Sequence, residues 1–118
     1  MRYLCLVYVE EKALDGLSEG EMRTLVDESL EYDEVLRKRG HYVTSNALQR
    51  VRTAATVRAR EGRAMVTDGP FAETREQLGG FILIEARDRD EAIQVASKIP
   101  VGRLGAIEVR PVQGLTHS

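Results

Sequence analysis

The chain has 118 residues, of which 42% are hydrophobic and 31% charged, as is usual for a single globular domain. Its 17 basic and 19 acidic residues give a formal net charge of −2, which argues against direct nucleic-acid binding. No apolar run approaches the roughly 20 residues of a membrane span, so no membrane partner is expected. One cysteine, two isolated histidines and the absence of a signal-peptide pattern favour a cytoplasmic protein without a disulfide, metal or other cofactor.

The first half of the chain predicts a strand, a long helix and a second strand. Residues 2–9 are rich in aromatic and branched side chains and contain no turn former, which is typical of a strand. Ser18 and Glu21 have the spacing of a capping box, so a helix is expected to begin at Ser18 and to stop at Gly40. Residues 42–48 predict a second strand.

The second half predicts a hairpin, an apolar strand, a short helix and a final strand. Alternating apolar and polar residues on both sides of a Glu-Gly turn indicate a β-hairpin over residues 54–67. Residues 80–86 read as an apolar strand, and residues 88–99 as a helix that Pro100 ends. A last strand is expected over residues 106–110.

The order of these elements predicts the fold. Without the hairpin it is strand, helix, strand, strand, helix, strand, the ferredoxin-like βαββαβ arrangement of the α+β class. Both helices should then lie on one face of an antiparallel sheet. We expect one domain over residues 1–112, followed by a loose tail over residues 113–118 in which His117 is solvated.

The first strand is apolar on both of its faces, which indicates self-association. One face carries Tyr3, Cys5, Val7 and Val9, and the other carries Leu4, Leu6 and Tyr8. Two helices can cover only one face of the sheet, so the other face is expected to pack on a second copy in a two-fold homodimer. The alternative is that the hairpin and the loop after it fold over that face within one chain.

The loop after the hairpin contains the densest group of candidate functional residues. The candidates for ligand binding are Asp68, Gly69, Pro70, Phe71, Glu73 and Thr74. In the functional interpretation the loop forms the rim of a pocket, with Asp68 as an acid/base group or hydrogen-bond acceptor. In the structural interpretation it is a rigid turn that Phe71 anchors in apolar surface. Gly79 and Gly80 would permit a close backbone approach or a bulge.

Ser29 and Asp33 are the candidates on the long helix. Helical projection places both in the middle of its apolar face. A carboxylate buried there would need partners or a raised pKa, and it could line a cleft beside Asp68. Alternatively, Asp33 is solvated or an arginine satisfies it. His41 follows the helix C-terminus, where it serves as a cap or as the base of a pocket.

Other reactive or charged groups have simpler interpretations. Cys5 lies among apolar neighbours in a strand and is expected to be a small buried hydrophobe rather than a nucleophile. Four arginines, at positions 52, 58, 60 and 63, cluster on the predicted hairpin. They form either a solvated face or a site for an anionic ligand or an acidic partner.

Residues 67–81, TDGPFAETREQLGGF, closely resemble the signature of the DGPF-domain proteins, a branch of the YCII-related family. The resemblance extends from Met1 to Val112 and includes Ala86, Asp90 to Ala92 and Ile107 to Val112. It implies a ferredoxin-like dimeric α/β-barrel fold, which agrees with the element order and the two-faced strands.

The resemblance implies less about activity. Relatives include a lyase of the dehydrochlorinase type, in which a His–Asp pair is the proposed active site; that histidine would fall near Ser29 here. Relatives are also encoded beside extracytoplasmic-function sigma factors, which implies a regulatory setting. We therefore expect an accessory or regulatory protein that binds a small ligand or a partner such as a sigma factor. The alternative is a cofactor-free lyase or isomerase that uses Asp68 in a cleft between sheet and helix, with Asp33, Ser29 or His41.

Overall fold

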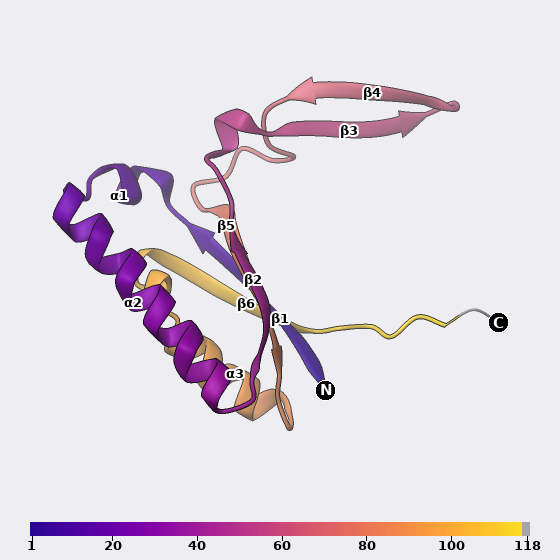
Figure 1. The fold of residues 1–118 in the computed structure, drawn as a ribbon. Coiled ribbons are helices and arrows are strands. Elements are labelled where there is room, and N and C mark those ends of the chain that lie inside the picture. Colours follow the sequence, from indigo (N-terminus) through magenta and orange to yellow (C-terminus); the bar gives the residue numbers. More distant parts are fainter. Residues whose placement is uncertain (117–118) are drawn as a thin grey trace.

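The computed structural model describes residues 1–116 and contains two antiparallel sheets with helices on one side (Figure 1). The strands are β1 (Arg2–Val9), β2 (Tyr42–Ala47), β3 (Ala55–Arg60), β4 (Arg63–Asp68), β5 (Gln77–Glu85) and β6 (Gly105–Pro111). The helices are α1 (Glu11–Asp15), α2 (Glu19–Lys38) and α3 (Arg89–Ser97), with 3-10 turns η1 (Val51–Thr53) and η2 (Pro100–Leu104). The large sheet has the order β2-β5-β1-β6, and β3 pairs only with β4.

This α+β architecture is compatible with the predicted ferredoxin-like fold. The capping box at the start of α2 is present: the Glu21 amide donates to the Ser18 hydroxyl at 3.1 Å, and the Ser18 amide donates to the Glu21 carboxylate at 2.9 Å. The short helix α1 was not expected, because its five residues lie in a stretch read only as polar. Residues 112–116 form no helix or strand, and His117 lies outside the described residues.

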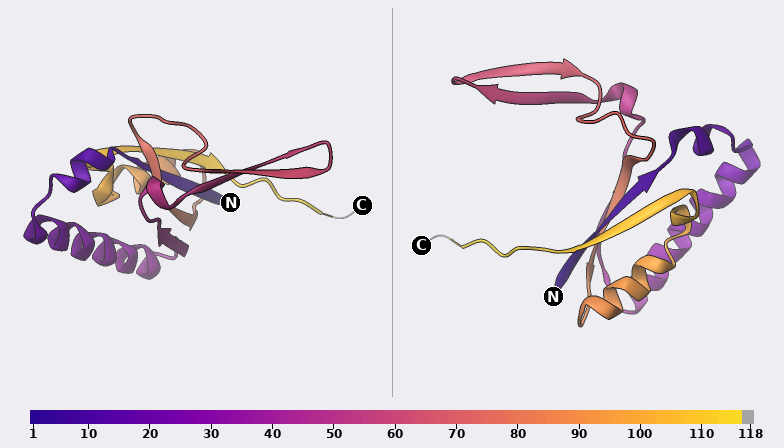
Figure 2. Two further views of the ribbon diagram at one scale, coloured as in Figure 1. Left: turned by 90° about the horizontal axis from the view of Figure 1, so that it is seen from above. Right: turned by 180° about the vertical axis from the view of Figure 1, so that it is seen from behind.

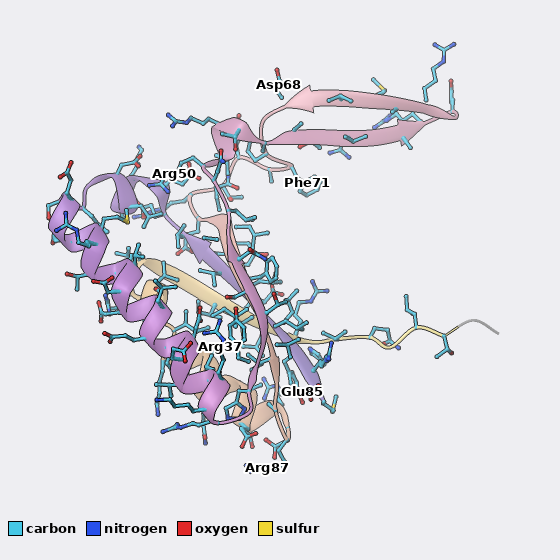
Figure 3. The ribbon with its side chains drawn as sticks, in the orientation of Figure 1. Arg37, Arg50, Asp68, Phe71, Glu85 and Arg87 are labelled. Carbon is cyan, nitrogen blue, oxygen red and sulfur yellow. The ribbon has the colours of Figure 1, made fainter. Side chains whose placement is uncertain are left out.

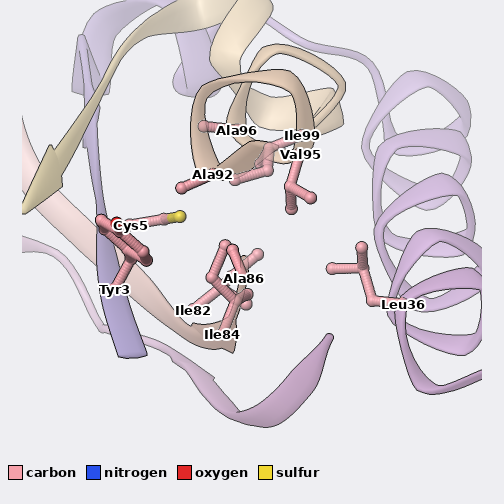
Figure 4. Close-up of a cluster of buried hydrophobic side chains, with 10 residues drawn as sticks. All are labelled: Tyr3, Cys5, Leu36, Ile82, Ile84, Ala86, Ala92, Val95, Ala96 and Ile99. Carbon is pink, nitrogen blue, oxygen red and sulfur yellow. The ribbon is translucent and has the colours of Figure 1, made fainter. Parts of the chain in front are cut away.

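One face of the large sheet forms the hydrophobic core with α2 and α3 (Figure 4). The β1 side chains alternate, and those facing the helices are buried: Tyr3, Cys5, Val7 and Val9. The prediction that Cys5 is a buried hydrophobe is confirmed, since the residue is fully buried. Burial raises the pKa of its thiol to about 11, which keeps the thiol protonated and unreactive at neutral pH.

Within the described residues 1–116, no helix covers the opposite face of the large sheet. The half-buried residues of β1 and β5 on this face, which we call the open face, are Leu4, Leu6, Tyr8, Phe81 and Leu83. The hairpin β3–β4 does not fold over them, because it extends away from the large sheet (Figures 1 and 2). Within one chain, the open face therefore lacks the cover that the alternative interpretation required.

Gly79 and Gly80 shape the centre of the large sheet, as the sequence predicted. Val7 pairs with Gly80 and Tyr8 pairs with Leu78, so Gly79 is an extra residue in a β-bulge. At Gly80 a Cβ atom would lie 2.8 Å from the carbonyl oxygen of Asn46 on β2. Only glycine therefore permits β2 and β5 to approach this closely.

The turn of the hairpin β3–β4 has the backbone geometry of a tight two-residue connection. Glu61 and Gly62 both have positive φ, at 49° and 76°, which is the requirement of a two-residue type I′ turn. At its base, the Gly69 amide donates to the Ala54 carbonyl at 2.8 Å. The hairpin predicted over residues 54–67 is thus present over residues 55–68.

None of the helices in residues 1–116 combines the length and the apolar character needed to cross a bilayer.

Candidate functional site

A cleft of about 450 Å³ lies between α2 and the helix-covered face of the large sheet. It exists because the two halves of α2 are held differently. Near its C-terminal end, Leu36 is only 1% exposed, and the Tyr32 hydroxyl donates a 2.6 Å hydrogen bond to the Val95 carbonyl on α3. The N-terminal half has one buried side chain, Leu25, and stands away from the strands.

The wall of the cleft is mainly apolar, and its size suits a small organic ligand. On the helix side it is lined by Met22, Leu25, Val26, Ser29, Leu30, Tyr32 and Asp33. On the sheet side it is lined by Val7, Val9, Ser45, Asn46, Ala47, Gly79, Gly80 and Ile82, and by the backbone side of Phe81, whose side chain lies on the open face. Leu30 lines the cleft and is 59% exposed, so its side chain lies at the rim.

One group of polar side chains in the cleft is centred on Asp33. The Ser45 hydroxyl donates to the Asp33 carboxylate at 3.4 Å, and the Tyr42 hydroxyl lies 2.8 Å from the same serine oxygen. Since serine has only one proton, Tyr42 donates to Ser45 while Ser45 donates to Asp33. Ser29 also lines the cleft, but its proton goes to the Leu25 carbonyl at 2.8 Å, so its oxygen is free only to accept.

The environment of Asp33 raises the pKa of its carboxyl. Desolvation raises the pKa of the carboxyl above its ordinary value of 3.8, and Glu34 acts in the same direction. The Arg37 guanidinium and the hydrogen bond from Ser45 lower the pKa but do not cancel the effect of desolvation. Asp33 is thus a carboxylate that gains from a ligand able to donate a hydrogen bond to it.

Asp33→Asn is expected to stabilise the protein at neutral pH. Because the folded state raises the pKa, it binds the proton more tightly than the unfolded state, and stability falls as pH rises through the folded pKa. The variant has no carboxyl at this position to ionise, so it does not lose stability in this way as the pH rises. Its melting temperature should therefore exceed that of the parent at pH 7. The difference should vanish below the ordinary pKa of 3.8, where both states of the parent are protonated.

Thermal melts of Asp33→Asn from pH 3 to pH 8, at one protein concentration, test this expectation. Asp68→Asn is the matched control, because it makes the same change at an exposed carboxylate. A pH-independent difference for Asp33→Asn, or a melting temperature below the parent at pH 7, would contradict the pKa direction.

Asp68 and His41 do not line this cleft. Asp68 ends β4 at the base of the hairpin, and its exposed side chain lies well away from α2 (Figure 3). His41 Nδ1 lies 2.8 Å from the Glu85 carbonyl oxygen and therefore donates to it, at the start of β2. The structure thus brings Ser29 and Asp33 together in one cleft, but within one chain it does not bring Asp68 or His41 to them.

The loop from Asp68 to Thr74 is exposed and ordered by local hydrogen bonds. Phe71 does not anchor it in apolar surface as expected; its side chain is 76% exposed, with the Arg58 guanidinium 5.4 Å from the ring centre. Gly69 has a φ of 107°, which favours glycine. The side-chain amide of Gln77 donates hydrogen bonds to the backbone carbonyls of Ala72 and Thr74, which fixes the end of the loop.

Of the predicted ligand-binding loop residues, two line a second, shallower hollow. Gly69 and Pro70 contribute to a space of about 410 Å³, together with Glu11, Asp15, Arg50, Val51 and Arg52. Arg50 is the cation best placed to hold an anion there, but its Nε and Nη2 atoms donate to Asp15 at 3.3 and 3.1 Å. This hollow is therefore held together by its own ion pair. Asp68, Phe71, Glu73 and Thr74 do not line it.

Sequence reasoning missed Tyr32 and Ser45 as members of the site. Ser45 faces the helices because it pairs with Ile82, a core residue of β5. The alternation of β2 could have shown this, since a lone serine on a helix-facing position needs a polar partner. Within residues 1–116, no group of three or more His, Cys, Asp or Glu side chains is placed to hold a metal ion.

Comparisons with known proteins agree with the sequence resemblance. The family model of the YCII-related domain matches residues 1–116. An uncharacterised protein of Rhizobium meliloti (strain 1021) is 36% identical over 118 aligned residues, which cover 95% of this chain and 92% of that protein.

Proposed function

This chain belongs to the YCII-related family, and we propose that it is an accessory or regulatory protein whose cleft between α2 and the large sheet binds one small molecule. The observation that carries the proposal is the cleft itself, a mainly apolar space of about 450 Å³. Its polar lining includes Asp33, which accepts a hydrogen bond from Ser45, and also Glu11, Gln49 and Arg50. Such a combination of an apolar wall and a few convergent polar groups is typical of small-molecule sites.

The chemistry of the cleft defines the class of ligand. Leu25, Val26 and Leu30 suit an apolar body, and Asp33 suits a hydrogen-bond donor such as a hydroxyl group. A ligand without that donor would leave Asp33 desolvated and without a new partner, which costs affinity. The proposed ligand is therefore a largely apolar molecule with one donor group.

A matched pair of probes tests this proposal. Para-ethylphenol and its methyl ether, para-ethylanisole, have similar apolar bodies, but only the phenol donates a hydrogen bond. Ligand-observed NMR titrations should show the phenol binding about tenfold more tightly than the ether, the equivalent of one hydrogen bond to a charged group. Equal affinities, or no binding of either probe, would contradict the proposed ligand class.

Three variants locate the binding. Asp33→Asn should narrow the difference between phenol and ether, because the acceptor loses its charge. Leu30→Ala should weaken both probes, since it removes apolar wall. Asp68→Asn should change neither affinity, because Asp68 does not line the cleft.

The raised pKa of Asp33 favours a second candidate function, a cofactor-free lyase or isomerase. A carboxylate that is poorly solvated in an apolar cleft is a stronger base than one in water and can accept a proton from carbon. The base in this version is Asp33 rather than Asp68, because Asp68 lies outside the cleft.

A benzisoxazole distinguishes the two functions without knowledge of the natural substrate. Its ring opens when a base removes the proton from carbon and the nitrogen–oxygen bond breaks, giving a cyanophenolate that is measured by absorbance. The enzyme function predicts turnover that Asp33→Asn abolishes and Asp68→Asn retains. The binding function predicts no difference between Asp33→Asn and the parent.

The working unit in this proposal is a homodimer that forms through the open face. Leu4, Leu6 and Phe81 are apolar and half-buried, and no helix of residues 1–116 covers their face of the sheet. Packing two such faces together removes both from water. Light scattering at micromolar protein concentration should give the mass of two chains; the mass of one chain would overturn this part of the proposal.

A regulatory role also needs a target, for which the sequence resemblance suggests an extracytoplasmic-function sigma factor. The exposed hairpin arginines, among them Arg60 and Arg63, offer a basic surface for an acidic segment of such a partner. Co-expression with a sigma factor encoded beside this chain should yield a complex that Arg60→Glu weakens. Separate elution of the two proteins would count against this target.

A further inference from the structure

The hairpin β3–β4 has an apolar face that no segment of residues 1–116 covers. The register pairs Val57 with Val66 and Ala59 with Ala64, so these four side chains share one face, with Ala55 and Asp68 on the same face at the base of the hairpin. Val57 is 63% exposed and Val66 is 65% exposed. The opposite face carries Thr56, Arg58, Arg60, Arg63, Met65 and Thr67. This alternation is the pattern of a strand pair with one buried and one solvated face.

The hairpin is also separated from the body of its own chain. The radius of gyration is 16.3 Å, whereas a compact domain of this length has about 13 Å. Figure 2 shows the hairpin extending well beyond the sheet and helices. A two-stranded hairpin that is isolated in water is marginally stable at best, yet this one has a well-defined turn and register. Its geometry therefore fits an arm that packs on another surface.

The direction of the hairpin identifies that surface. It leaves the end of the large sheet and extends on the side of the open face, opposite to α2 and α3 (Figures 1 and 2). A second copy that lies against the open face would thus be flanked by the hairpin. We propose that the hairpin is an exchanged arm that packs the apolar face formed by Val57, Ala59, Ala64 and Val66 onto a second copy of the chain. This inference rests on the proposed homodimer.

The area that a stable dimer needs supports the second copy as the occupant. A face of four strands, which are 8, 6, 9 and 7 residues long, covers roughly 500 Å², from the usual spacing of strands and residues. A standard interface buries about 800 Å² on each partner, so the open face alone supplies less than two thirds of it. The apolar face of the hairpin adds to the area that each copy buries, and so does the surface that receives the partner's hairpin. With the open face, these two surfaces bring the buried area on each copy to about 800 Å².

Two neighbouring positions on β4 provide a matched test. Val66→Glu places a charge on the apolar face of the hairpin, and Thr67→Glu places the same charge on its opposite face. Sedimentation equilibrium should show that Val66→Glu raises the dimer dissociation constant at least tenfold, whereas Thr67→Glu leaves it within about twofold. Equal effects of the two substitutions, or no effect of Val66→Glu, would overturn the proposed arm.

A shortened hairpin controls for local unfolding by the introduced charge. Thr56 and Thr67 are directly paired, so an Asn-Gly turn between them can replace residues 57–66 and keep the base intact. This variant should keep the helical circular dichroism of the parent and lose dimer affinity at least as strongly as Val66→Glu. A shortened variant with parental dimer affinity would overturn the arm.

Leu6→Glu separates failure of the arm from failure of the homodimer. Leu6 lies on the open face, so this variant should be monomeric whether or not the hairpin contributes. If Leu6→Glu is monomeric while Val66→Glu dimerises like the parent, the sheet dimer stands and the arm fails. If the parent itself is monomeric, both fail. A hairpin that binds only a foreign acidic protein, without any change in self-association, also overturns the arm.

Discussion

Leu36→Ala is expected to lower the free energy of unfolding by about 3 kcal/mol, within the range for a leucine truncated in a packed core. Leu36 is 1% exposed and is one of the three largest fully buried side chains of the described residues. It holds the C-terminal half of α2 against the core that β5 and α3 form. Urea denaturation at a fixed protein concentration measures the loss, since a dimer's stability depends on concentration.

Leu30→Ala is the matched control on the same helix. Leu30 is 59% exposed, so the same truncation should cost less than about 1 kcal/mol. The pair also separates two roles of α2, because Leu30 lines the cleft and Leu36 does not. If the two variants lose similar stability, α2 does not have one anchored half and one free half, and the account of how the cleft forms is wrong.

Gly105→Ala is expected to destabilise the fold by a similar amount, about 3 kcal/mol, at the upper end for an overpacked site. Gly105 is the first residue of β6 and pairs with Val9 of β1. A Cβ atom there would overlap the carbonyl oxygen of Tyr8 and lie 2.9 Å from the Val9 Cα. The backbone cannot give way without breaking the pairing of β1 with β6, because both contacts are with main-chain atoms.

Gly114→Ala serves as the control for Gly105→Ala. No atom lies within 4 Å of the Cβ position at Gly114, and the residue is outside the sheet. Its melting temperature should match that of the parent. A parental melting temperature for Gly105→Ala would contradict the close approach of β6 to β1, whereas a loss at Gly114 would mean that the tail packs on the body.

Local patterns were sufficient to predict most elements of the fold. The Ser18–Glu21 capping box, the aromatic and branched residues of the stretch 2–9 and the Glu61-Gly62 turn are each local to a few residues. These signals are strong because the interactions behind them form within the same short segment of the chain. The short helix α1 escaped prediction because a five-residue helix with a single large apolar residue, Leu14, carries no apolar periodicity.

The site was harder to predict because it depends on distances between elements. Helical projection correctly placed Ser29 and Asp33 on the sheet-facing side of α2, but it could not show that this half of α2 stands away from the strands. The separation of Asp68 from Asp33 depends on the direction in which the hairpin leaves the sheet, and Phe71 is exposed for the same reason. Residue periodicity shows on which face of an element a side chain lies. It does not show the direction in which the hairpin leaves the sheet or the distance between α2 and the strands.

The claim that the cleft between α2 and the large sheet is the binding site is tested most directly by two-dimensional amide NMR during a titration with para-ethylphenol. The account predicts that the largest chemical-shift changes occur in residues 22–33 of α2 and in Ser45 and Asn46 of β2. Asp33→Asn should reduce them. Shifts confined to the hairpin or to the loop from Asp68 to Thr74, with α2 unaffected, would contradict it.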